Sequence, residues 1–157
     1  MDTYGIPEDH IFSSRDLSFV KGVMRMTNNR GVDVALNSLS GEFLRRTWDC
    51  MAPMGRFIEV GKKDVFANGK LDMFPFSKSV TFATFMLDTF GEVDPKGFNR
   101  LLQIIVSLWQ EGKIRPPTPY TVSTLSRLEE EFRSMQAGQH VGKIILTANK
   151  DDLIKVS

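Results

Sequence analysis

Small and hydrogen-bonding residues gather at three places in the sequence, each directly after a segment that we expect to be a strand. They are Ser13-Ser14-Arg15, residues 37–41 and residues 61–64. In an open α/β sheet, ligands bind beyond the carboxyl ends of the strands, so the three clusters predict one site for a polar ligand. Ordinary turn chemistry is the alternative interpretation, because Ser, Asn and Gly are also the residues that turns prefer.

Lys62 is the side chain in these clusters with the clearest chemical use. It follows an expected strand and a glycine, so its ammonium could donate a proton or hold an anion at the end of the sheet. The alternative is a solvated surface lysine, which is the usual setting of this residue type. Arg15 and Lys143 leave the same two interpretations open.

The histidines and the single cysteine do not predict metal or nucleophilic chemistry. His10 and His140 have no cysteine or carboxylate at ligand spacing, and we interpret them as structural or surface residues. One cysteine, Cys50, excludes an internal disulfide and a cysteine-rich zinc site. It lies beside Trp48 and Met51, where a buried, inert thiol is expected. We therefore expect no metal site.

Known phosphate-binding and catalytic signatures are missing from the sequence. It contains no G-x-G-x-x-G, no P-loop, no G-x-S-x-G and no H-E-x-x-H. The phosphate cradle of a complete nucleotide-binding half is therefore not encoded here.

Composition limits the classes of protein further. The chain has 157 residues and a formal net charge of +1, with 41% hydrophobic and 25% charged residues. These values are typical of a globular domain and exclude a fully disordered chain. The balanced charge gives no basis for binding nucleic acid or an anionic membrane. Because no apolar run could span a bilayer and no signal peptide begins the chain, we expect a single-domain cytoplasmic protein.

Strands and helices alternate along the chain and must position the three clusters. Segments rich in apolar and β-branched residues predict strands at residues 11–14, 32–36, 56–60, 80–85 and 141–147. Helical spacing of apolar residues, with Gly or a capping box at the ends, predicts helices at residues 17–26, 40–55, 95–110 and from 126 to 138. Residues 63–79 are expected to be irregular, and residues 116–119 extended. The alternation predicts βαβ units and a parallel α/β sheet.

Four segments are more specific than any periodicity. They read YGIPEDHIFSSR (residues 4–15), GVDVALNSLSGE (31–42), GRFIEVGK (55–62) and MQAGQHVGKIIL (135–146). Together they closely resemble the enoyl reductase domain of fungal highly reducing polyketide synthases. That domain belongs to the zinc-independent medium-chain dehydrogenase/reductase superfamily. The tail DDLIKV (151–156) resembles the exit from this domain towards a ketoreductase region.

The resemblance covers the C-terminal half of such a domain. It implies an α/β fold with a partial Rossmann-type parallel sheet. Strands 1 and 2 of that sheet are missing, and so is the GroES-like barrel. A C-terminal helix and strand return towards the catalytic domain. Residues 1–115 would be the second half of the NADPH-binding Rossmann domain. Residues 116–148 would be the C-terminal segment of the catalytic domain, and residues 149–157 a linker. Without strands 1 and 2, the strand at 11–14 loses its neighbours and the strand at 32–36 exposes an apolar edge.

The resemblance also implies a reaction and a site. NADPH would deliver hydride to the β-carbon of an α,β-unsaturated acyl thioester held on an acyl carrier protein, followed by protonation at the α-carbon. In the family, Asn37, Ser38 and Leu39 lie at the nicotinamide end of NADPH with Gly61 and Lys62 close by. Ser14 and Arg15 lie near the adenosine end, and Lys62 is the candidate proton donor.

One position departs from the family pattern. The carboxylate that would partner Lys62 aligns with Met86, so we expect it to be missing. Asp88 is two residues further on, a displacement of ~7 Å along a strand. This departure favours the alternative function, a catalytically inactive remnant that acts as an interaction or dimerisation module, with a homodimer as one form. A stand-alone quinone oxidoreductase of the same superfamily is the third interpretation.

Overall fold

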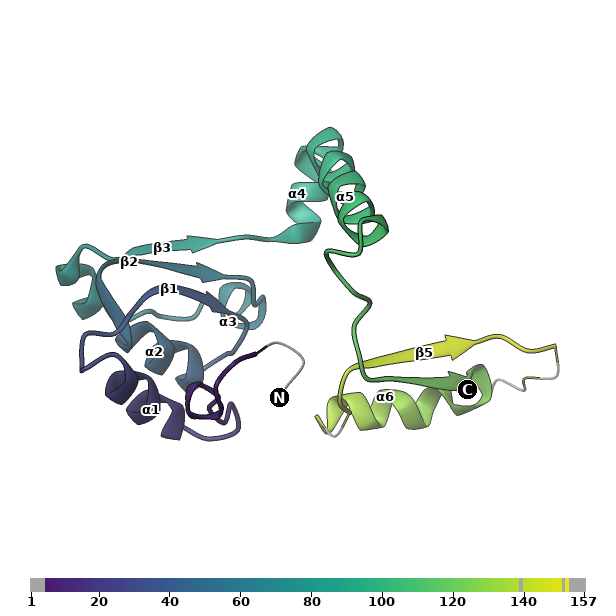
Figure 1. Ribbon diagram of the computed structural model, residues 1–157, viewed down its shortest axis with the longest axis horizontal. Coiled ribbons are helices and arrows are strands. Elements are labelled where there is room, and N and C mark those ends of the chain that lie inside the picture. The colour runs from purple at the N-terminus through teal and green to yellow at the C-terminus, as the bar shows by residue number, and fades with distance from the viewer. Residues whose placement is uncertain (1–4, 139, 151, 153–157) are drawn as a thin grey trace. The chain divides into compact units, whose positions relative to one another are not determined.

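Residues 5–138, 140–150 and 152 are described by the computed structural model (Figure 1). The chain divides between Phe98 and Asn99 into an N-terminal and a C-terminal unit, inside helix α5 (Pro95–Gln110). No described helix is both long enough and apolar enough to cross a membrane.

A parallel three-stranded sheet organises the N-terminal unit. Its strands are β1 (Val32–Asn37), β2 (Met51–Glu59) and β3 (Thr81–Thr84), in the order β1-β2-β3. Helices α1 (Ser18–Met26) and α2 (Glu42–Asp49) lie on one side of this sheet in Figure 1. The predicted parallel α/β arrangement is therefore confirmed, and the carboxyl ends of the strands share one edge.

Aromatic packing between α2 and the sheet makes the core of this unit. Trp48 and Phe57 are fully buried and meet edge to face, with ring centroids 5.5 Å apart. Phe82 stacks on Phe57 at 5.2 Å. The Trp48 indole N–H donates to the Asp72 carbonyl at 2.8 Å, so the segment that precedes β3 is fastened to α2.

Four short elements of the N-terminal unit are not predicted by the sequence patterns. They are η1 (Glu8–His10), α3 (Lys63–Phe66), η2 (Phe74–Lys78) and α4 (Leu87–Val93). Each spans two turns or fewer, which is too little for a period of 3.6 residues to be visible.

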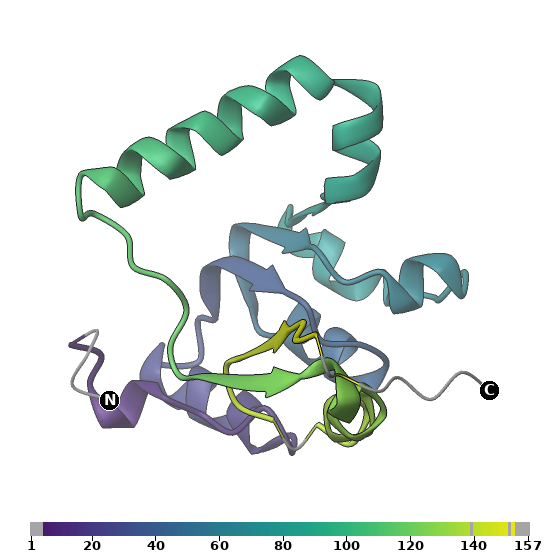
Figure 2. The same cartoon turned by 90° about the vertical axis from the view of Figure 1, so that its right-hand side faces the viewer.

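The C-terminal unit contains a βαβ arrangement. Strands β4 (Tyr120–Thr124) and β5 (Lys143–Thr147) pair in parallel, and η3 (Leu125–Arg127) and α6 (Leu128–Gln136) connect them. Figure 2 shows the two strands side by side, and α6 contributes Phe132 and Met135 to an apolar pocket shared with Ile144 of β5. Strand β4 directly follows residues 116–119, which we expected to be extended, and the sequence patterns did not predict it.

Two predicted elements are wrong in position or kind. The described backbone of residues 11–14 forms no strand, because no neighbouring strand is present to pair with it; the Phe12 ring packs directly on Gly22 of α1 instead. The second helix ends at Asp49, not at Gly55, and β2 already begins at Met51. Met51 is fully buried and pairs with Val32, so tertiary burial overrides its helical spacing.

The start of the last helix also differs from the prediction. Helix α6 begins at Leu128, and among the described residues no side chain caps it. The Ser126 hydroxyl donates to Asp152 at 2.8 Å, and Glu129 pairs with Arg133. The predicted capping box therefore does not form, although Gly138 ends the helical segment in a left-handed conformation with φ +64°.

Strand β1 is an edge strand in the described sheet. Its Val34 and Leu36 side chains are 57% and 75% exposed. The apolar sequence of β1 is typical of a central strand. In the described sheet, however, β1 pairs with β2 alone, so it has the exposed apolar edge that we expected.

Candidate functional site

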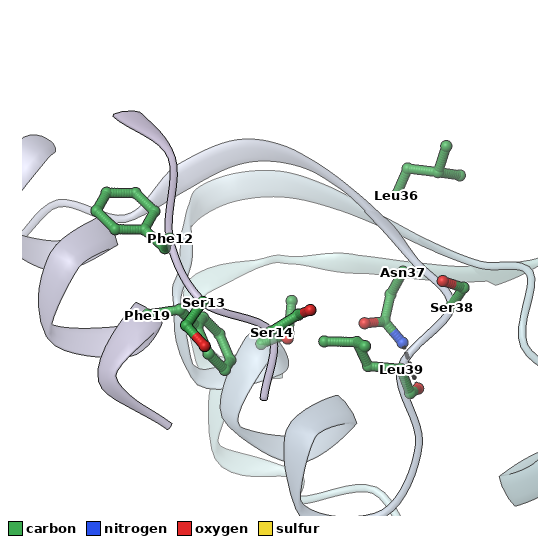
Figure 3. Close-up of a pocket in the computed structure, with 9 residues that line it drawn as sticks. Phe12, Ser13, Ser14, Phe19, Leu36, Asn37, Ser38 and Leu39 are labelled. Atoms are coloured by element: carbon green, nitrogen blue, oxygen red, sulfur yellow. Dashed lines mark hydrogen bonds between the residues drawn. The ribbon is translucent and has the colours of Figure 1, made fainter. Parts of the chain in front are cut away.

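A pocket of about 420 Å³ opens where β1 ends, beside the segment that precedes α1 (Figure 3). Its walls come from three parts of the N-terminal unit, namely residues 12–19, residues 36–39 and α2, and are made by Phe12, Ser13, Ser14, Phe19, Leu36, Asn37, Ser38, Leu39 and Thr47. Two of the three polar clusters expected from the sequence thus converge. Ser14 lies between Ser13 and Asn37 in Figure 3.

The pocket has the chemistry of part of a nucleotide site. Serine hydroxyls and an amide face a space that also has phenylalanine and leucine walls, which suits a planar ring and a sugar with hydroxyl groups. The residues therefore fit part of a dinucleotide. Arg15 does not line the pocket; its backbone N–H donates to the Ser13 hydroxyl at 3.1 Å, and its side chain is exposed.

Asn37 is the most constrained side chain of the pocket. It is 3% exposed, and its amide nitrogen donates to the Leu39 carbonyl at 2.8 Å and to Glu59 Oε2 at 2.5 Å. Glu59 Oε1 accepts the backbone N–H of Gly61 at 2.5 Å. The buried Glu59 carboxylate at the end of β2 therefore bonds both Asn37, the first residue of the cluster at 37–41, and Gly61, the first residue of the cluster at 61–64.

The third cluster, residues 61–64, lies directly against the second. A methyl group on Gly61 would come within 3.3 Å of the Ser38 carbonyl oxygen, a tight contact that glycine avoids. Asp64 of α3 accepts the backbone N–H of Gly41 at 2.8 Å. The expected proximity of Gly61 to Asn37 and Ser38 is therefore present, although Gly61 and Lys62 do not line the pocket itself.

Lys62 does have a carboxylate partner. Its Nζ donates to Asp88 Oδ2 at 2.5 Å, and both side chains are about half exposed. The hydrogen bond from Lys62 lowers the pKa of Asp88, with a smaller contribution from a backbone N–H. The expectation that this carboxylate is missing is wrong: Met86 precedes the first turn of α4, and that turn brings Asp88 back to Lys62.

The remaining candidates behave as their simpler interpretations predicted. His10 pairs with Asp9 at the surface, and Lys143 is exposed on β5. Cys50 is buried, and burial raises the pKa of its thiol. Among the described residues, no three His, Cys, Asp or Glu side chains are grouped to hold a metal ion.

Glu59 was missed in the sequence, and Asp64 and Asp88 were noted there without the contacts that they make. Glu59 and Asp64 hold neighbouring backbone and amide groups in place, and Asp88 pairs with Lys62. The position of Glu59 between Ile58 and Val60, at the end of an apolar strand, could have indicated its role. A charged side chain at such a position is either exposed or bonded at each of its polar atoms.

Comparison with known proteins gives a consistent family. The family model described as "Zinc-binding dehydrogenase" matches residues 7–146. Highly reducing polyketide synthase 40 of Fusarium mangiferae is 52% identical over 98% of this chain. Reducing polyketide synthase rads1 of Floropilus chiversii is 50% identical over 96% of it. In each case the match spans 6% of the relative's own length.

Solved structures agree with this result. The CurF ER cyclopropanase from the curacin A pathway is 30% identical with a TM-score of 0.78, over 92% of this chain and 42% of its own. The nucleotide-binding subdomain of the PpsC enoylreductase domain from Mycobacterium tuberculosis is 40% identical with a TM-score of 0.58, over 66% and 57%. CurK enoyl reductase is 31% identical with a TM-score of 0.74, over 89% and 41%.

Proposed function

Since this chain belongs to the zinc-binding dehydrogenase family, we propose that it is part of an NADPH-dependent enoyl reductase that works within a fungal reducing polyketide synthase. The supporting observation is the pocket that both Ser14 and Asn37 line, with Gly61, the residue before Lys62, bonded to Asn37 through Glu59. Its substrate would be an α,β-unsaturated acyl thioester carried by an acyl carrier protein. The family description names zinc, but the described residues offer no fitting ligand group.

The roles of the pocket residues are those that the family resemblance implies, and their chemistry is compatible with them. When bound, NADPH supplies the hydride. Ser14 would donate to or accept from the sugar hydroxyls at the adenosine end, with Phe12 and Phe19 as apolar walls. Asn37, Ser38 and Leu39 would hold the nicotinamide end. Arg15, which is exposed outside the pocket, would reach only a charged group at its mouth.

Lys62 would hold and place a proton near the reacting carbons. The Asp88 carboxylate orients the ammonium through a charge-assisted hydrogen bond. As negative charge develops on the thioester oxygen, a nearby ammonium stabilises it and can return a proton to the α-carbon. Both groups are half exposed, so a substrate can reach the ammonium.

The position in a larger protein is part of the same proposal. Residues 1–115 would belong to the cofactor-binding domain, residues 116–148 to the catalytic domain, and residues 149–157 to a linker. Much of that tail, residues 151 and 153–157, lies outside the described residues. A cytoplasmic location and a homodimer remain predictions of the sequence.

Activity is tested most sharply in a fusion. The chain is placed behind the region that precedes the matched segment in the Fusarium mangiferae synthase, and NADPH consumption is followed with a short α,β-unsaturated acyl pantetheine thioester. We expect reduction of the carbon–carbon double bond, and Lys62→Met to slow it at least tenfold. Lys63→Met removes the same charge one residue later and serves as the control.

Two outcomes would contradict the proposal. A folded fusion that binds NADPH but does not reduce the thioester would favour the inactive-remnant alternative. Equal loss of activity in Lys62→Met and Lys63→Met would remove Lys62 from the proton-transfer step.

A further inference from the structure

Glu59 is a buried carboxylate at the point where all three strands of the N-terminal sheet end. It is 1% exposed and lies in register with Asn37 of β1 and Thr84 of β3. Its backbone carbonyl accepts the N–H of Phe85 at 2.9 Å. The main chain of Glu59 is therefore fixed from both sides, and its side chain has little freedom to move.

Each carboxylate oxygen of Glu59 holds one donor. Oε2 accepts from the Asn37 amide and Oε1 accepts from the Gly61 backbone N–H, both at 2.5 Å. A buried carboxylate is costly unless its oxygens are bonded. These two bonds supply that compensation and join the end of β1 to the turn that carries Lys62.

The bond to Asn37 decides which way its amide faces. The Leu39 carbonyl and the Glu59 carboxylate are both acceptors, so the NH₂ group must face them. In Figure 3 the amide nitrogen points to the Leu39 carbonyl, and the amide oxygen points away from it. Among the described residues no donor is bonded to this oxygen, which leaves it as an acceptor at the wall of the pocket.

We propose that Glu59 is a positioning residue of the cofactor site: it fixes the Asn37 amide with its oxygen towards the pocket and holds Gly61 against Ser38. This inference rests on the proposed function, because it assigns the fixed oxygen to a hydrogen-bond donor of the bound cofactor. Glu59 acts through Asn37 and Gly61 and does not itself line the pocket.

Glu59→Gln tests the inference because glutamine has only one acceptor atom. Its oxygen can take the N–H of Gly61 or that of Asn37, and its NH₂ group then faces the other donor. Glu92→Gln makes the same change of charge on the exposed surface of α4 and is the control. In Asn37→Asp/Glu59→Gln the donor and acceptor are exchanged, so the bond between these side chains and the bond to Gly61 can form again.

The first readout is NMR of the purified chain without cofactor. We expect slow exchange of the Gly61 amide proton in the wild type and in Glu92→Gln. Exchange should be about tenfold faster or more in Glu59→Gln, with a shifted Asn37 side-chain NH₂ signal, and slow again in the double variant. Rapid exchange of the Gly61 amide in the wild type would overturn the inference even if Glu59→Gln fails to fold.

The second readout is NADPH affinity by titration calorimetry. The Kd should rise about tenfold or more in Glu59→Gln and stay unchanged in Glu92→Gln. Unchanged affinity in a folded Glu59→Gln chain with altered NMR signals would reduce Glu59 to a purely structural role and overturn the inference. No NADPH binding by a folded wild type would contradict a cofactor site held by this chain alone, and the titration is then repeated in the fusion. The NMR readout would still decide whether Glu59 sets the Asn37 and Gly61 geometry.

Discussion

Replacing Gly61 with alanine perturbs the junction between the two halves of the site by one methyl group. That methyl would lie 2.5 Å from Glu59 Oε1 and 3.3 Å from the Ser38 carbonyl oxygen. The first distance is too short for any relaxed contact, so the Glu59 carboxylate must move. Because this carboxylate is buried and bonded at both oxygens, its movement breaks or weakens the bond to the Gly61 N–H.

The size of the effect follows from two opposing contributions. A lost hydrogen bond to a charged group costs about 1.5–3 kcal/mol. Alanine gains about 0.4–1 kcal/mol because it restricts the unfolded chain, and Gly61 has no left-handed φ that would cancel this gain. We therefore expect the free energy of unfolding to fall by about 1–2 kcal/mol.

Gly91→Ala is the matched control for this substitution. In α4 the new methyl would meet the Phe98 ring at 3.7 Å, an ordinary van der Waals contact. Alanine in a helix is favoured over glycine by about 0.5–1 kcal/mol, so this variant should gain stability. Urea unfolding followed by circular dichroism measures both changes. A Gly61→Ala chain at least as stable as the wild type would refute the reasoning about Glu59.

Three further predictions concern single side chains. In Lys62→Met the pKa of Asp88 should rise towards its ordinary value, as measured by carbon NMR titration. Because Lys62 lowers that pKa, any contribution of the pair to stability is present above the ordinary carboxyl pKa. It is lost as the pH falls through the lowered value. The buried Cys50 thiol, whose pKa is raised, should react with an aromatic disulfide reagent only after urea unfolding, and rapid reaction of the native chain would contradict its burial. Trp48→Phe removes an indole hydrogen bond and buried volume, so the free energy of unfolding should fall by about 2–3 kcal/mol. Trp109→Phe, at an exposed site, should change it by less than about 0.5 kcal/mol. Equal effects in the two variants would contradict the assigned core.

Local patterns in the sequence predicted the long elements well. Helix α5 runs from Pro95 to Gln110 as expected, because sixteen residues with one apolar stripe and a following glycine leave little choice. The strand at residues 11–14 was wrong because a strand needs a neighbour, and local composition carries no information about one. The early start of β2 depends on the burial of Met51, which is also a tertiary property.

Part of the candidate site could also be predicted from the sequence. Asn37 and Gly61 come together because the carboxyl edge of a parallel sheet gathers the residues at the ends of its strands. Ser14 lines the same pocket as Asn37 although no strand precedes it. Glu59 was missed because alternation along a strand does not say whether a polar side chain is exposed or bonded inside. Asp88 was placed along an expected strand, and the helical first turn of α4 changed its reach.

The measurement that tests the cofactor site most directly is thermal unfolding of the purified chain with and without excess NADPH. At a hundredfold excess over Kd, binding should add ~2.7 kcal/mol of stability. For a chain of this size, that corresponds to a Tm raised by about 5–10 °C. A cooperative transition raised by NADPH is the predicted result. A cooperative transition that NADPH leaves unchanged would contradict the claim that this chain holds the cofactor.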